Sequence, residues 1–123
     1  MEMLLAALLA SALPASAASV LTGVSVGAGG GRLAVSGPVR FRAFRLSGPE
    51  RFVVDLLDTE LGVRERRWPG AGGVRRLRAG PWGEAAGVTR MVFDLAAPLS
   101  AVAREAGGAV IVELRPLRAP TAP

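Results

Sequence analysis

The chain has 123 residues, half of them hydrophobic, and a formal net charge of +5. This length suits a single domain with one packed core. The sequence has no cysteine and no histidine, which excludes disulfides, thiol nucleophiles, the usual zinc sites and proton transfer by histidine. Aspartate and glutamate are the only acid–base groups left, and no spaced pair of them stands out. We therefore expect no enzyme activity, no cofactor and no metal.

All 15 basic residues are arginines. The planar guanidinium suits carboxylates and phosphates, so an anionic partner is one explanation of this charge. The other is a genome whose codon usage favours Ala, Gly, Arg and Pro. Composition alone leaves both explanations open.

The first residues are typical of an export signal. An apolar run at 3–13 is followed by Pro14 and by the sequence ASA at 15–17, a small-x-small pattern that signal peptidases accept. The run is shorter than the roughly 20 residues that span a bilayer, so no stable membrane span is expected. We predict a signal peptide at 1–17, a domain at 18–116 and a Pro-rich tail at 117–123.

The rest of the chain predicts β-structure. Short runs of Val, Leu, Phe and Ile are separated by Gly and Pro every eight to twelve residues or so, and no helical periodicity is sustained. The expected strands are 20–26, 33–37, 38–46, 51–58, 74–80, 88–98, 100–107 and 109–116. The first two and the last two form hairpins across glycine turns. The stretch 59–73 is less regular, and 81–87 is a loop.

The strand at 38–46 alternates between two faces. Val39, Phe41 and Ala43 share one face and Arg40 and Arg42 the other, and we expect the alternation to shift near residue 44.

One short pattern occurs twice: RFVVDL at 51–56 returns as RMVFDL at 90–95. Because side chains alternate along a strand, each copy has one thoroughly apolar face and one face carrying Arg and Asp around a Val. Such strands fit the middle of a sheet in a two-layer fold. We predict an all-β fold, a small two-sheet β-sandwich built from two similar halves that contribute one sheet each.

The order of these motifs resembles the AMIN domain, a β-sandwich module of bacterial cell-envelope proteins. The resemblance covers about residues 20–116. It rests on Pro-x-Arg-x-Val-x-Asp-Leu at 49–56, Val-Arg-x-Leu-Arg-x-Gly at 74–80 and Arg-x-Val-x-Asp-Leu at 90–95. The Arg-rich stretch at 64–67 and the sequence GPW at 80–82 depart from the family pattern.

The resemblance implies a non-catalytic role in the periplasm. In this family the module localises a partner domain, either a cell-wall amidase or an outer-membrane secretin of type IV pili, by contacting peptidoglycan. The implied partners are therefore peptidoglycan and an amidase or secretin. A rival within the same fold is a module that docks onto a pilus secretin or another envelope complex.

Four residues of the repeat have two interpretations. Arg51 with Asp55, and Arg90 with Asp94, could contact a ligand, the arginine donating to a peptide carboxylate and the aspartate accepting from sugar hydroxyls. Alternatively, each pair lies within the sheet and holds the fold together, which is the interpretation we favour.

The densest charge lies in the strand at 74–79. Simple alternation places Arg76 and Arg78 on one face with Val74, and Arg75 on the other with Leu77. These arginines form either a binding strip for an anionic polymer or a solvated face that protects a sheet edge.

Trp68 and Trp82 both lie beside Pro and Gly, in expected loops. Exposed loop aromatics can stack on sugar rings, but aromatic residues more often close the end of a sandwich, and we expect the second role. A nucleic-acid partner is disfavoured because neither a recognition helix nor an aromatic–basic strand motif is present, and export would separate the protein from such a target.

Overall fold

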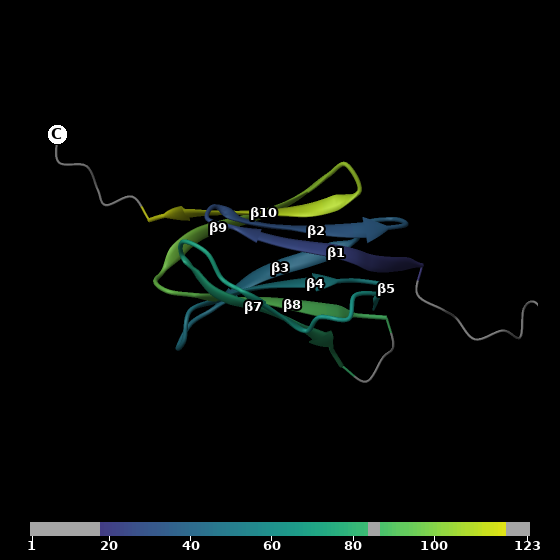
Figure 1. Cartoon of the computed structure of the whole chain (residues 1–123), viewed down its shortest axis with the longest axis horizontal. Coiled ribbons are helices and arrows are strands. Elements are labelled where there is room, and N and C mark those ends of the chain that lie inside the picture. Colours follow the sequence, from purple (N-terminus) through teal and green to yellow (C-terminus); the bar gives the residue numbers. More distant parts are fainter. Residues whose placement is uncertain (1–17, 84–86, 118–123) are drawn as a thin grey trace, which may run out of the picture.

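The computed structural model describes residues 18–83 and 87–117, which form two five-stranded sheets. The sheets lie face to face as two layers (Figure 1). No helix occurs among the described residues, so the predicted all-β, two-sheet fold is confirmed. The proposed signal peptide at 1–17 lies outside the described residues, as does the tail beyond residue 117.

Sheet I has the strand order β5-β1-β2-β10-β9. Its strands are β1 (Ser19–Gly27), β2 (Gly30–Ser36), β5 (Thr59–Leu61), β9 (Leu99–Ala106) and β10 (Ala109–Pro116). The β1–β2 and β9–β10 pairs are the two hairpins that the sequence predicts. Because β2 pairs with both β1 and β10, the first hairpin and the last hairpin form one continuous sheet.

Sheet II has the strand order β3-β4-β8-β7-β6, and every neighbouring pair is antiparallel. Its strands are β3 (Phe41–Leu46), β4 (Arg51–Leu56), β6 (Arg67–Pro69), β7 (Val74–Pro81) and β8 (Thr89–Leu95). Strands β5 and β6 both lie within the stretch 59–73, where the sequence pattern predicted no regular strand.

The core lies between the two sheets and follows strand alternation. In β4 and β8 the inward residues are Phe52, Val54, Leu56, Met91, Phe93 and Leu95. They meet inward residues of sheet I such as Leu33 and Val110, all almost fully buried. Gly31 has no side chain, and the ring of Phe93 occupies the space there: a Cβ on Gly31 would lie 3.0 Å from Phe93 Cε2.

The two copies of the repeat are neighbours within one sheet. Strands β4 and β8 pair antiparallel, with Arg51 opposite Asp94, Val53 opposite Val92 and Asp55 opposite Arg90. The expectation that each copy would lie in its own sheet is therefore wrong. An antiparallel pair of similar motifs has an approximate two-fold axis, here at the Val53–Val92 pair, and this axis places each Arg opposite the Asp of the other copy.

Three local expectations also need correction. Strand β3 pairs with β4 in unbroken register, so there is no shift near residue 44. In β7 a bulge between Val74 and Arg76 lets Val74 point into the core, although simple alternation placed it on the arginine face. Trp68 lies in strand β6 rather than in a loop. Its side chain is partly buried and packs against the core.

Within the described ranges, no helix is long and apolar enough to cross a membrane.

Candidate ligand-binding face

The face of sheet II that points away from sheet I carries the charged side chains of the repeat. Cross-strand pairing arranges its residues in three rows. The rows are Arg42–Asp55–Arg90–Gly80, Phe44–Val53–Val92–Arg78 and Leu46–Arg51–Asp94–Arg76. We call this surface the outer face of sheet II. Phe44, Val53 and Val92 form an apolar row between two rows that carry the aspartates and four of the five arginines.

Asp55 holds three strands together. Arg90 on β8 donates from Nε to Oδ1 at 2.7 Å and from Nη2 to Oδ2 at 2.8 Å. Arg42 on β3 donates from Nε to Oδ2 at 3.3 Å. The Asp55 side chain is 0% exposed, because the two arginines lie over it. The paired Arg90–carboxylate geometry is the strong, two-point form of this interaction.

Asp94 plays the corresponding role at the other end of the face, but with different partners. Both of its arginines come from β7: Arg76 Nε lies 2.7 Å from Oδ2, and Arg78 donates at 2.7 Å to Oδ2 and at 2.9 Å to Oδ1. Asp94 therefore links β8 to β7, whereas Asp55 links β8 to β4 and β3.

Both aspartates are held in the ionised form. Burial by itself raises the pKa of Asp55, but the hydrogen bonds and positive charge of Arg90, and then of Arg42, more than offset this and leave the pKa lowered. Burial likewise raises the pKa of Asp94, and its bonds to Arg78 and Arg76 reverse the effect. The hydrogen bond to Asp94 in turn raises the pKa of Arg78. These carboxylates are anchors for arginine and are poor proton donors at neutral pH.

The apolar row is covered by the side chains around it. Val53 is 1% exposed although it points away from the core. The guanidinium carbon of Arg90 lies 5.3 Å from the centre of the Phe44 ring and 3.6 Å from the centre of the Trp82 ring. Both distances fit cation–π contacts, and the second is a close stacking of the guanidinium on the indole.

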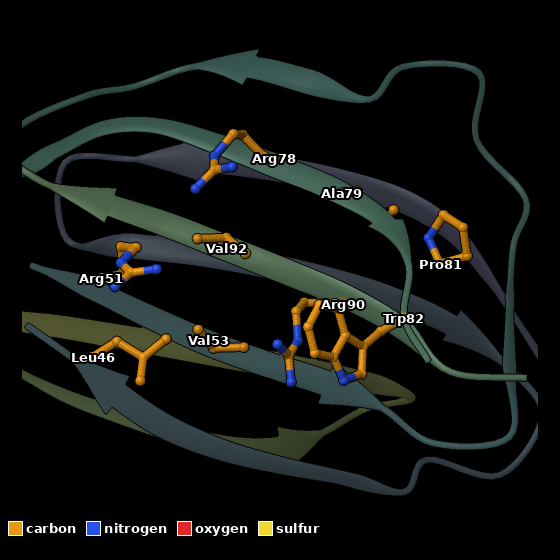
Figure 2. Close-up of a pocket in the computed structure, with 10 residues that line it drawn as sticks. Leu46, Arg51, Val53, Arg78, Ala79, Pro81, Trp82, Arg90 and Val92 are labelled. Carbon is orange, nitrogen blue, oxygen red and sulfur yellow. The ribbon is translucent and has the colours of Figure 1, made fainter. Parts of the chain in front are cut away.

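A hollow of about 440 Å³ opens over this row. Figure 2 shows Arg51 at one end of it, Arg90 and Trp82 at the other, and Val53 and Val92 between them. Arg78 and Leu46 lie along its sides, and none of the described residues that line it carries a carboxylate. The hollow thus combines an apolar floor, an aromatic wall and three guanidinium groups.

The structure places most of the candidate residues on this face but changes their pairing. The predicted pairs within each copy, Arg51 with Asp55 and Arg90 with Asp94, do not form. Asp55 binds Arg90 of the other copy, and Arg51 Nε instead donates to the carbonyl of Pro49 at 3.1 Å. The favoured interpretation as fold-holding contacts is therefore right for Asp55, Asp94 and Arg90, although with other partners, and it does not describe Arg51.

Two other candidates differ from expectation. Arg75 is the extra residue of the β7 bulge and does not line the hollow over Val53 and Val92. It lines a second hollow together with Arg76 and Asp94. Trp82 does not close the end of the sandwich: it is 49% exposed and stacks on Arg90. Of the two interpretations of this tryptophan, the exposed stacking surface fits the structure.

Sequence reasoning missed Arg42, Phe44 and Leu46 as parts of this face. The signal was present in FRAFRL at 41–46, where strict alternation continues through the strand and places these three residues together. Across the described part of the chain, no group of three metal-ligating side chains occurs.

A sequence model of one family, the AMIN domain, matches residues 24–118. This chain belongs to the AMIN domain family. AMIN domains are non-catalytic accessory modules of cell-envelope proteins, where they occur with amidases and secretins and are associated with peptidoglycan. No curated protein matches the sequence.

Proposed function

We propose that this AMIN domain is a non-catalytic periplasmic module that binds peptidoglycan through the outer face of sheet II. The observation that carries the proposal is the hollow on that face, in which arginines fixed by buried aspartates surround an apolar floor beside an exposed tryptophan. Export through residues 1–17 is part of the proposal.

The chemistry of this face suits a polymer of sugars and short peptides. Five arginines and two aspartates (Arg42, Arg51, Arg76, Arg78, Arg90, Asp55 and Asp94) leave a formal excess of three positive charges, 5 − 2. Arginine forks recognise the carboxylates of wall peptides, and an exposed indole offers a flat apolar surface for a sugar ring or a methyl group. Because four of these arginines, all but Arg51, are held by Asp55 and Asp94, they lose little side-chain freedom on binding.

The test is co-sedimentation of the purified chain with isolated peptidoglycan sacculi across a salt series. We expect retention at about 0.15 M salt, where loose surface attraction is already screened. Trp82→Ala should weaken retention roughly fivefold, the effect of losing about 1 kcal/mol of aromatic contact. It leaves the Arg90–Asp55 pair in place.

The matched control is Leu117→Ala, which removes another exposed apolar side chain away from this face. It should sediment like the unaltered chain. Absence of retention, or equal retention of the Trp82 variant and the unaltered chain, would contradict binding through this face.

A second candidate function is docking onto an envelope protein, and strand β9 favours it. It lies at the end of sheet I, pairs only with β10 among the described residues, and exposes Val102. An open strand edge can accept a strand from another protein. This candidate predicts capture of a secretin or amidase partner that survives digestion of the peptidoglycan and is lost in Val102→Pro, whereas Trp82→Ala leaves it unchanged.

A further inference from the structure

The approximate two-fold symmetry of the outer face is broken at one residue. Symmetry pairs Asp55 with Arg90 and Asp94 with Arg51, and the strand register does place Arg51 opposite Asp94. Only the first ion pair forms. Asp94 is bound instead by Arg76 and Arg78, which donate three hydrogen bonds to it. Arg51 therefore lies opposite Asp94 but forms no ion pair with any described carboxylate.

The guanidinium of Arg51 keeps most of its hydrogen-bonding capacity. Of its five N–H donors, one is used within the described residues, from Nε to the Pro49 carbonyl. Arg78 and Arg90 also line the hollow, but each already donates two hydrogen bonds to an aspartate, which it shares with a second arginine. Among the described residues that line the hollow, Arg51 is thus the one arginine with no carboxylate partner, and it lies at one end (Figure 2).

The hollow is elongated, and its floor is apolar. Its floor is Val53 and Val92, and the Trp82 ring stands at the far end. Arg90 lies opposite Asp55, four residues along β4 from Arg51, which is about 13 Å at 3.3 Å per residue. That span matches about four residues of extended peptide.

We infer that this hollow binds the free carboxylate end of a short peptide, with Arg51 receiving the carboxylate and the peptide lying over Val53 and Val92 towards Trp82. The inference rests on the proposed function, because it names the part of the wall polymer that this site recognises. The planar carboxylate of a peptide end matches the guanidinium fork, and the chain behind it can cover the apolar floor, which inorganic phosphate would leave uncovered.

The experiment compares two soluble probes by titration calorimetry and Trp fluorescence: diacetyl-Lys-D-Ala-D-Ala as the free acid and as its C-terminal amide. We expect the acid to bind the purified chain at least tenfold more tightly than the amide, because charge-assisted hydrogen bonds contribute about 1.5–3 kcal/mol. Arg51→Gln should lower the affinity for the acid to that for the amide and leave the amide unchanged.

The matched control is Arg32→Gln, which removes the same charge from an exposed position of β2 in sheet I. It should bind the acid like the unaltered chain. The acid–amide comparison uses the unaltered chain, so it holds even where a variant folds poorly. Equal affinity for acid and amide would overturn the inference, as would displacement of the acid by an equal concentration of inorganic phosphate.

Sedimentation with sacculi separates this inference from the proposed function. Retention of the unaltered chain together with equal binding of acid and amide would overturn the carboxylate site and leave wall binding standing. Absence of both retention and peptide binding would overturn both. Retention that weakens in Arg51→Gln and is unchanged in Arg32→Gln would support both.

Discussion

At the scale of single residues, the two aspartates of the repeat have the same sequence context but different exposure. Asp55 is completely covered, whereas the Asp94 side chain is 12% exposed and its two arginines are 53% and 37% exposed. A charge is costly to bury unless it is paired, so removal of a buried partner leaves a larger penalty than removal of a half-exposed one. Substitution of Asp55 should therefore destabilise the fold more than substitution of Asp94, although the two residues look equivalent in the sequence.

We predict that Asp55→Asn lowers the free energy of unfolding by about 3 kcal/mol, since it leaves Arg90 buried without its carboxylate. Asp94→Asn should lower it by about 1–2 kcal/mol, because solvent compensates Arg76 and Arg78. Urea denaturation measures both. Glu113→Gln, in the exposed Arg104–Glu113 pair on sheet I, is the control and should leave the midpoint unchanged. An equal loss for the two aspartate variants would contradict the role assigned to burial.

At the scale of elements, strand β2 joins the first hairpin to the last, and its first residue allows the close approach of β10. Gly30 has φ = +137°, and a Cβ there would lie 1.9 Å from the carbonyl oxygen of Val112. Backbone rather than a flexible side chain occupies that space, so the overlap can be relieved only by moving β10. Gly29, one residue earlier, has nothing within 4 Å of the corresponding position.

Gly30→Ala should therefore lower the free energy of unfolding by at least about 2 kcal/mol, from backbone strain and from displacement of β10. Gly29→Ala changes the same residue type in the same turn and should be close to neutral. Thermal unfolding monitored by circular dichroism compares the two variants. A similar melting temperature for both would show that the contact with Val112 does not constrain sheet I.

At the scale of the whole molecule, Asp55 and Asp94 together connect four of the five strands of sheet II. Their pKa values are lowered in the folded protein from an ordinary 3.8, so the unfolded chain takes up protons first as the pH falls. The stabilisation from these carboxylates is fully present above the unfolded pKa and is lost as the pH falls through the folded one.

We expect the melting temperature to be flat near neutral pH and to fall below about pH 5, about one unit above the unfolded value. The chain has no histidine, so no group of that type adds a transition between pH 5 and 8. Asp55→Asn and Asp94→Asn should each flatten the acid part of the curve. A curve of unchanged slope in the double variant would assign the acid sensitivity to other carboxylates.

The alternation of side chains along each strand determined how much of the fold could be predicted from the sequence. The face of each residue in β4 and β8 followed from a period of two, as did the fold class. Which strands are neighbours did not, because alternation assigns faces and carries no information on pairing. That is why the two copies were expected in separate sheets.

The outer face was only partly predictable for two further reasons. The bulge in β7 adds one residue, Arg75, which no periodic pattern indicates. Phe44 and Leu46 are apolar and were not expected to point outward, yet they do so because long arginine side chains cover an apolar row on that face. The ion pairs depend on which residues lie opposite each other on neighbouring strands, and this register was known only from the structure.

The directions of the strands in sheet I also determine how the domain resists a pulling force. Strands β1 and β10 flank β2 and run parallel to each other, so Ser19 and Pro116 lie at opposite ends of the sheet (Figure 1). Tension applied at these two residues loads the hydrogen bonds of β1–β2 and β2–β10 together, in shear, and none of them can open alone. The domain should resist such a pull strongly and yield first to a force that peels β9 from its free edge.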